Sequence, residues 1–413
     1  MARKFDVPDY YRSEAVLSLK QSRHKLDPKK HDLRPTIVDF GPVQFQLARH
    51  FGFCFGVENA IEIAYKVVNE NSGKRIFLLS EMIHNPSVNA DLLSKGVRFL
   101  MKTDGTRLID FETLNAEDIV VVPAFGTTIE LQKELEAAGV NPYKYDATCP
   151  FVEKVWKRAD DLGRRGFTVI VHGKHTHEET RATFSHSKTT APTLIVRDME
   201  QAQSVISYMR GEKSSEAILK EFATAVSEDF NPERDLIKIG VVNQTTMLAT
   251  DTKAIAAEFR SAMESKYGPE ALKEHFADTR DTLCYATYEN QSATRELTQS
   301  GAHLSLVVGG YNSSNTSHLV ELLQEHMPSF YIKDSDEILS RTKISHFDLG
   351  QKKILETSNW LPNSDVSPVK IAITAGASCP DSSVDEVIRK VAEFFPGARN
   401  WDKAIADSST LND

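Results

Sequence analysis

The sequence predicts an α/β fold of small, mostly parallel sheets in three related units. From about residue 45 onward, short β-branched runs alternate with longer helical patterns, which is typical of parallel strands joined by crossover helices. The runs are apolar almost throughout, which favours strands buried on both faces. The four cysteines, Cys54, Cys149, Cys284 and Cys379, are separated by 95, 135 and 95 residues. These intervals suggest that one α/β pattern recurs.

A chain of 413 residues is long enough for two or three domains of roughly 150 residues each. Two charged helical stretches, 211–235 and 261–281, can account for the longer middle interval as peripheral insertions. The expected organisation is an N-terminal extension (1–44) followed by three α/β domains (45–150, 151–281 and 282–413).

Eight apolar runs are the expected strands, and polar residues follow most of them. The runs are 76–80, 118–125, 167–173, 193–198, 236–244, 303–310, 329–334 and 369–376. Six of them end in Ser, Thr, Asn, His or Gly just before a helical pattern. Helix capping explains part of this regularity. The carboxyl ends of parallel strands and helix N-termini also bind anionic ligands, so the loops additionally predict an anion pocket.

Composition and charge exclude several classes of protein. With Lys+Arg 49 against Asp+Glu 58, the net charge is −9, so nucleic acid is not an expected partner. The apolar stretches are far shorter than the roughly 18–20 residues of a membrane helix. The N-terminus has no signal or transit pattern, so a cytoplasmic location is expected. The basic residues of the extension indicate either a solvated tail or a partner site.

Three of the cysteines adjoin polar loops at expected strand ends. No two cysteines form a CxxC pair, so any site that they share must be assembled by folding. Taken singly, each is more often a small buried hydrophobic residue. Taken together, Cys54, Cys149 and Cys284 could bind a metal and leave one position open, either as a zinc site or as an iron–sulfur cluster. The spacing does not choose between these metals.

Polar residues in the same loops suggest a diphosphate site. His84 and His177 fall at strand-to-helix turns, and their loops should converge with the hydroxyl and amide groups of one further loop. That loop contains Ser313, Ser314 and Asn315. Glu178 and Glu179 open one helix, and we expect one to cap it and the other to be a buried proton donor. Thr245, Thr246 and Ser378 complete the polar ring, whereas His50, His172 and His175 are weaker candidates.

Seven motif groups, in this order, resemble the LytB family of 4-hydroxy-3-methylbut-2-enyl diphosphate reductases. They are HFGFCFGV, EMIHNPSV, DATCPFV, HEET, NQTT, CYAT with YNSSNTSHL, and TAGAS. The resemblance covers about residues 48 to 392. Each motif is weak alone, but the ordered set is specific. PAFGTT places Phe125 where many bacterial members have a histidine, which is similar to the plant and cyanobacterial branch.

The resemblance implies a trefoil of three pseudo-symmetric α/β domains around one 4Fe–4S cluster with three cysteine ligands, Cys54, Cys149 and Cys284. The fourth iron would be open to the substrate's hydroxyl. The implied reaction reduces the allylic diphosphate to isopentenyl and dimethylallyl diphosphate, the last step of the methylerythritol phosphate route. Ferredoxin or flavodoxin would supply the electrons.

The same resemblance implies roles for individual residues. Glu179 would relay protons, with Thr245 near the substrate's hydroxyl. The diphosphate would be held by His84, His177, Ser313, Ser314, Asn315 and Ser378. Cys379 matches no ligand position, so we expect a structural role for it. Two other hypotheses stay open from the residues alone: a zinc-dependent hydrolase of a phosphorylated metabolite, and a non-enzymatic iron–sulfur sensor.

Overall fold

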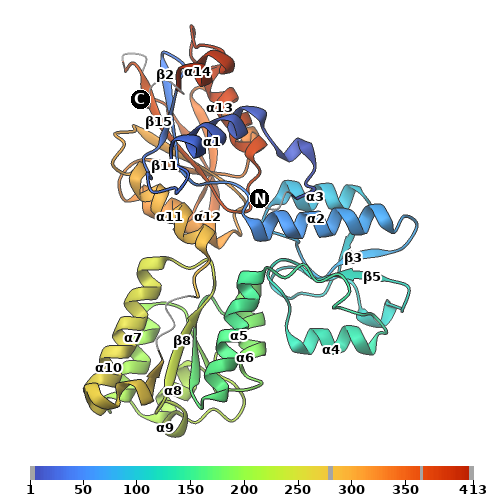
Figure 1. The fold of residues 1–413 in the computed structure, drawn as a ribbon, viewed down its shortest axis with the longest axis vertical. Helices are drawn as coiled ribbons and strands as arrows, with labels where there is room; N and C mark the ends of the chain where they lie inside the picture. The colour runs from blue at the N-terminus through green and yellow to red at the C-terminus, as the bar shows by residue number, and fades with distance from the viewer. Residues whose placement is uncertain (1–4, 278–281, 363–365, 409–413) are drawn as a thin grey trace. The chain divides into compact units, whose positions relative to one another are not determined.

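The computed structural model describes residues 5–277, 282–362 and 366–408, and it divides into two compact units (Figure 1). Unit 1 comprises Met1–Glu58, His84–Val88 and Tyr285–Asp413. Unit 2 comprises Asn59–Ile83 and Asn89–Cys284. The three-domain division therefore stays a prediction, since residues 45–58 are grouped with the C-terminal segment.

Unit 1 is built on one eight-stranded sheet with the order β1-β2-β15-β10-β11-β13-β12, in which β14 pairs with β13. Its strands are β1 (Thr36–Asp39), β2 (Val43–Leu47), β10 (Leu304–Val308), β11 (Ser329–Ile332), β12 (Ile338–Ser340), β13 (Lys343–Asp348), β14 (Lys353–Ser358) and β15 (Val369–Ala375). The central strands β2, β15, β10 and β11 are parallel, whereas β1, β12, β13 and β14 pair antiparallel at the margins.

The helices of unit 1 close its core around this sheet. They are η1 (Asp9–Tyr11), α1 (Glu14–Leu26), α11 (Tyr285–Leu297), α12 (Ser314–Gln324), η3 (Ser335–Glu337), α13 (Asp381–Ala392) and α14 (Trp401–Ser408). Helix α1 packs against α13 and α14 (Figure 1). Val16 and Leu19 of α1 are buried, and Lys20 forms an ion pair with Asp381 of α13 at 2.7 Å. The N-terminal extension is therefore folded onto unit 1 rather than a solvated tail.

Unit 2 contains two parallel sheets, with the orders β4-β3-β5 and β7-β6-β8-β9. The strands are β3 (Ile76–Leu78), β4 (Arg98–Phe99), β5 (Ile119–Val121), β6 (Thr168–His172), β7 (Thr193–Val196), β8 (Ile239–Asn243) and β9 (Phe276–Ala277). The helices are η2 (Phe111–Thr113), α4 (Ile129–Ala137), α5 (Pro150–Arg164), α6 (Glu178–Ser187), α7 (Met199–Met209), α8 (Ser215–Glu221), α9 (Pro232–Asp235) and α10 (Ala249–His275). Helices α2 (Phe55–Glu70) and α3 (Pro86–Ser94) have residues in both units.

The α/β class with mostly parallel sheets is confirmed, and each of the eight expected runs contains a strand. Seven strands were not expected: β1, β2, β4, β9 and β12 to β14. Strands β12 to β14 are partly exposed and lack a continuous apolar run. Of the expected insertions, 211–235 includes α8 and α9, and most of 261–281 belongs to α10. Gly268 (φ 80°) and Pro269 interrupt α10, and residues 278–281 lie outside the described part of the chain.

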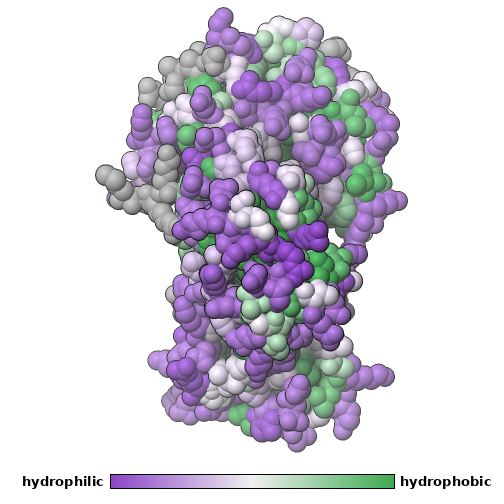
Figure 2. All heavy atoms as spheres, turned by 90° about the vertical axis from the view of Figure 1, so that its right-hand side faces the viewer, coloured by the Kyte–Doolittle hydropathy of each residue, from purple (hydrophilic) through white to green (hydrophobic). Residues whose placement is uncertain are grey.

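Along the described ranges, no helix is long and apolar enough to cross a membrane. Figure 2 shows a face that is largely hydrophilic, with hydrophobic side chains in small groups.

We predict that Gly163→Ala destabilises unit 2. A Cβ at this position of α5 would lie 2.7 Å from the backbone oxygen of Thr190, which is too close for any carbon. An exposed helical glycine would gain about 1 kcal/mol on becoming alanine, whereas this one should lose about 1–3 kcal/mol of unfolding free energy. Urea unfolding followed by tryptophan fluorescence measures the change. Lys154→Ala, an exposed change in the same helix, is the control and should stay within about 0.5 kcal/mol.

Candidate functional site

In unit 2, two parallel strands place a buried glutamate against a threonine. Strands β6 and β8 pair in register up to His172 and Asn243, so the loops that follow them leave the sheet at the same edge. Thr245 donates to the carboxylate of Glu179 twice, through its backbone N–H and through Oγ1 at 2.9 Å. Glu179 is 1% exposed. The carboxyl group is thus held in a fixed position away from bulk water.

The adjacent glutamate has a different partner. Ser80, which follows β3, donates its hydroxyl to Glu178. The cap of α6 is neither glutamate but His177, whose Nδ1 accepts from the N–H of Glu179 at 3.2 Å. The expectation that one glutamate caps this helix is therefore wrong, because both carboxylates are bonded to other loops.

Two of the expected metal ligands lie beside this glutamate. Cys149 stands at the start of α5 and donates its N–H to Ala124 O at 2.9 Å. Cys284 precedes α11 and donates its N–H to Thr245 O at 3.4 Å. Burial, together with the nearby Cys284 and Glu179, raises the pKa of the Cys149 thiol to about 11. A thiolate here is disfavoured without a nearby cation, which fits a metal-binding role.

Gln244 and Ser80 are polar residues whose roles the sequence analysis missed. The Oε1 of Gln244 accepts from Thr180 Oγ1 at 3.0 Å and from Lys174 N at 3.2 Å, and its Nε2 donates to Thr246 at 2.7 Å. Gln244 therefore ties the loop after β6 to the loop after β8. Its place in the NQTT motif was a signal, whereas nothing local marks Ser80 as the partner of a glutamate.

Phe125 contacts a histidine from the expected diphosphate clamp. Its ring lies edge-on to the imidazole of His177, with 5.8 Å between the ring centroids. The aromatic residue therefore supplies an apolar wall to His177. It cannot replace the hydrogen-bonding capacity of an imidazole.

Unit 1 brings together a second polar group at the start of α12. Ser313 caps this helix through its side chain, which accepts from Thr316 N. Asn315 accepts from Ala377 N at 3.0 Å, and Ser378 donates to the backbone oxygen of His84 at 3.1 Å. The loops before α3, α12 and α13 are thereby joined at one edge of the unit 1 sheet.

This group retains hydrogen-bonding capacity. Ser314 Oγ and Asn315 Nδ2 are buried atoms with no partner among the described residues. A buried donor without a partner costs free energy, which an oxyanion would recover. The amides at the beginning of α12 also favour negative charge. The arrangement therefore fits the phosphate oxygens that the sequence predicted here.

Cys54 and Cys379 both belong to unit 1. Cys54 precedes α2, is partly exposed and donates its N–H to Ala377 O at 3.2 Å. Cys379 is fully buried, and its thiol lies 3.6 Å from Pro380 O. The contrast agrees with a ligand role for the first and a structural role for the second. Both roles stay predictions.

The expected site residues are divided between the two units. Unit 2 contains Cys149, Cys284, Glu179, Thr245 and His177, and unit 1 contains Cys54, His84, Ser313, Ser314, Asn315 and Ser378. Among the residues that the structure describes, no three His, Cys, Asp or Glu side chains are grouped closely enough to hold a metal ion. The three-cysteine site therefore stays a prediction.

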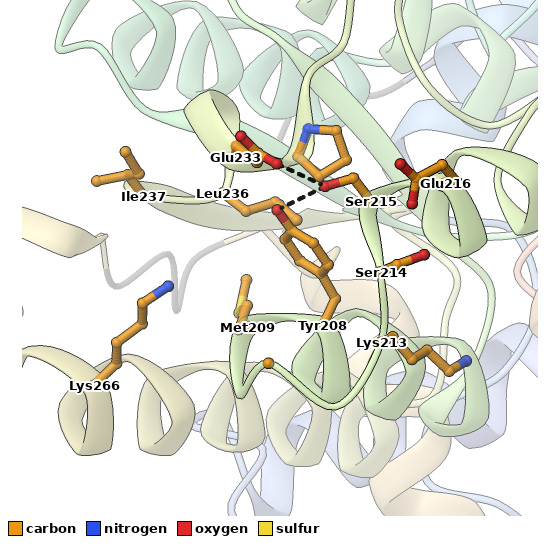
Figure 3. Close-up of a pocket in the computed structure, with 12 residues that line it drawn as sticks. Tyr208, Met209, Lys213, Ser214, Ser215, Glu216, Glu233, Leu236, Ile237 and Lys266 are labelled. Atoms are coloured by element: carbon orange, nitrogen blue, oxygen red, sulfur yellow. Dashed lines mark hydrogen bonds between the residues drawn. The ribbon is translucent and has the colours of Figure 1, made fainter.

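A further cavity in unit 2 lies among elements of the expected insertions. It measures about 440 Å³ and is lined by residues of α7, α8, α9 and α10 or of the loops beside them. Figure 3 shows Tyr208 and Glu233 pointing toward Ser215. The Ser215 hydroxyl donates to the Tyr208 hydroxyl oxygen at 3.4 Å and to the Glu233 carboxylate at 3.3 Å. None of the predicted site residues lines this cavity.

Comparisons with known proteins find relatives over most of the chain. The LytB protein family matches residues 45–392. A 4-hydroxy-3-methylbut-2-enyl diphosphate reductase of Gloeobacter violaceus is 39% identical over 95% of this chain and 90% of its own length. The reductase of Thermosynechococcus vestitus is 41% identical over 85% of both chains. A chloroplastic reductase of Botryococcus braunii is 39% identical over 89% of this chain and 74% of its own length.

Two solved structures share the fold. A structure of (E)-4-hydroxy-3-methyl-but-2-enyl diphosphate reductase covers 84% of this chain with a TM-score of 0.50 and 23% identity, and 98% of that structure is matched. The structure of E-1-hydroxy-2-methyl-but-2-enyl-4-diphosphate reductase from Plasmodium falciparum covers 84% of this chain and 86% of its own, with a TM-score of 0.59 and 21% identity.

We predict an unusual pH dependence for alkylation of Cys149 in the metal-free protein. Since the folded pKa is raised to about 11, the reactive thiolate fraction at pH 8 should be only about one in a thousand. The rate with iodoacetamide, measured by peptide mass spectrometry, should rise about tenfold per pH unit from pH 8 to pH 10. Glutathione, a thiol that is not buried in a protein, is the control for the alkylation rate. A rate for Cys149 that levels off near pH 9 would contradict the raised pKa.

Proposed function

The chain belongs to the LytB family, and from this membership we propose that it is an iron–sulfur reductase of (E)-4-hydroxy-3-methylbut-2-enyl diphosphate. The products are isopentenyl diphosphate and dimethylallyl diphosphate. The reaction is the last step of the methylerythritol phosphate pathway to isoprenoids. The curated relatives that match most of the chain bear the name of this activity.

The observation that carries the proposal is the buried Glu179–Thr245 pair beside Cys149. Removal of a hydroxyl group as water consumes two protons and two electrons, so the site needs a proton donor in a dry environment. Glu179 is buried and accepts both hydrogen bonds from Thr245. A carboxyl group in this position can deliver a proton while Thr245 orients the substrate's hydroxyl.

The cluster is proposed to be held by Cys54, Cys149 and Cys284. Two of these thiols, Cys149 and Cys284, are neighbours in unit 2, which supports a shared site. The family supplies the identity of the group, a 4Fe–4S cluster. When bound, it would supply low-potential electrons and one iron without a cysteine ligand as a Lewis acid.

The diphosphate is proposed to be held by the polar residues described in both units. His84, His177, Ser313, Ser314, Asn315 and Ser378 are the expected contacts. The unpartnered Ser314 Oγ and Asn315 Nδ2 at the start of α12 support this assignment. Hydroxyl, amide and imidazole donors together suit the several oxygens of a diphosphate. The electrons are proposed to come from a carrier such as ferredoxin or flavodoxin, and the cytoplasmic location stays a prediction.

We expect Glu179→Gln to bind substrate but to lose turnover by about 10²- to 10⁴-fold, because the amide keeps the shape but cannot deliver the proton. Glu178→Gln is the comparison, since Glu178 is also buried but is bonded to Ser80. The measurements are turnover with reduced methyl viologen and the iron content of each variant. Full turnover in Glu179→Gln would move the proton role to another residue.

Anaerobic purification tests the cluster and its ligands. The wild-type protein should be brown and contain iron and sulfide, and Cys54→Ser should lose both colour and activity. Cys379→Ser should keep both, since that thiol is fully buried and lies near Pro380 O. A colourless wild-type protein that contains zinc would refute the proposed reductase. Cluster loss in Cys379→Ser alone would refute the choice of three ligands.

A further inference from the structure

A cavity in unit 1 connects the N-terminal extension to the loop of Cys54. It measures about 510 Å³. Four of its lining residues, Phe5, Lys20, His24 and Lys30, come from the extension. Arg49, His50 and Cys54 line it from the segment between β2 and α2. None of the roles proposed above uses this cavity except through Cys54.

The segment that provides these lysines is strongly basic in an acidic chain. Residues 20–34 contain six Lys and Arg against two Asp, whereas the whole chain has a net charge of −9. The charge is fixed in space because α1 is anchored. Ser13 donates to Asp385 at 2.8 Å, and Lys20 bonds Asp381 and Phe51 O at 2.7 and 2.9 Å. A fixed local excess of positive charge attracts acidic partners from a distance.

Buried nitrogen atoms on the cavity wall have no partner. Arg49 Nε, His50 Nε2 and Asn290 Nδ2 are unpaired among the described residues, and each of the three residues is at least nine-tenths buried. Burial and the positive charges of Lys30 and Arg49 together lower the pKa of His50 to about 4. The Arg49 and Asn290 atoms are N–H donors, for which carboxylates are natural acceptors.

Glu289 partly balances this charge. Its Oε2 lies 3.5 Å from both Lys30 Nζ and His50 Nδ1. The ion pair between Arg49 and Asp27 is long, at 4.0 Å. Lys30 is still exposed, so it can exchange the distant Glu289 for a carboxylate on another molecule.

Exposed aromatic side chains lie beside this cavity, at the beginning of α2 and of α11. Phe55 and Tyr285 line the cavity and are 36% and 41% exposed, and Tyr288 on the next turn of α11 is 50% exposed. Aromatic residues beside a basic rim are typical of protein docking surfaces rather than of sites for small ions. An electron carrier that docks here would approach Cys54, one of the proposed cluster ligands.

We propose that this surface, formed by Lys20, Lys29, Lys30, Arg49, Phe55 and Tyr288, docks an acidic one-electron carrier protein. The inference rests on the proposed reductase activity, which requires external electrons. Two carriers are oxidised per turnover, each by one electron. The substrate's C–O bond breaks, two protons are taken up and water leaves. The basic extension is therefore the site at which the carrier binds when it delivers electrons to this enzyme.

The test reverses two exposed charges and supplies electrons in two ways. Lys29→Glu with Lys30→Glu should raise the KM for a plant-type ferredoxin at least tenfold at low salt, because it removes electrostatic attraction. Reduced methyl viologen, a small carrier that needs no docking surface, should drive turnover within twofold of wild type. Added salt should raise the wild-type KM for ferredoxin and so reduce the difference in this KM between wild type and the double variant.

The matched control is a second lysine pair in unit 1. Lys352→Glu with Lys353→Glu changes the same charge at the β13–β14 turn, and Lys352 has a positive φ (52°) as Lys30 does (55°). This variant should keep the ferredoxin KM within twofold. An equal rise in both variants, or none in either, overturns the docking surface. Loss of viologen-driven turnover in the first variant alone also overturns it.

Two further outcomes separate the hypotheses. If wild type with an intact cluster fails to reduce the substrate with viologen, the proposed function itself fails. If inorganic phosphate slows viologen-driven turnover, and the Lys29 and Lys30 changes relieve this without altering the ferredoxin KM, the cavity binds a small oxyanion and the docking proposal is wrong.

Discussion

The parallel pairing of β6 with β8 is the constraint on which the buried Glu179–Thr245 pair of unit 2 depends. Because the strands end together at His172 and Asn243, the loops that follow them meet at one sheet edge. A buried carboxylate is costly unless it is hydrogen-bonded, and Thr245 meets that requirement for Glu179. The pairing therefore fixes both the position of the carboxyl group and its separation from water.

The same geometry recurs in unit 1 with a different chemical result. Strands β10 and β15 pair up to Val308 and Ala375, so the loops before α12 and α13 also meet. Here the loops supply hydroxyl and amide groups, and the bond from Ala377 N to Asn315 joins them. One rule of parallel sheets thus produces a buried, hydrogen-bonded carboxyl group in one unit and an edge of hydroxyl and amide groups in the other.

The basic extension shows how packing changes the meaning of a charge pattern. From the sequence, the basic residues of the extension indicated a solvated tail ahead of a partner site. Burial of Val16 and Leu19 and the pairing of Lys20 with Asp381 fix the helix on unit 1. Charges held on a rigid helix can present one surface to a partner, whereas charges on a mobile tail cannot.

The sequence by itself determined the α/β class, the eight apolar strands and the polar loops, because buried parallel strands need continuous apolar runs and their ends need polar caps. It did not reveal the exposed strands β12 to β14, which lack such a run. The family resemblance assigned the proton role to Glu179, but only the tertiary structure gave the two glutamates their different partners, Ser80 for Glu178 and Thr245 for Glu179, 98 and 66 residues away. Partners so distant are decided by strand order and register, which local sequence patterns do not encode.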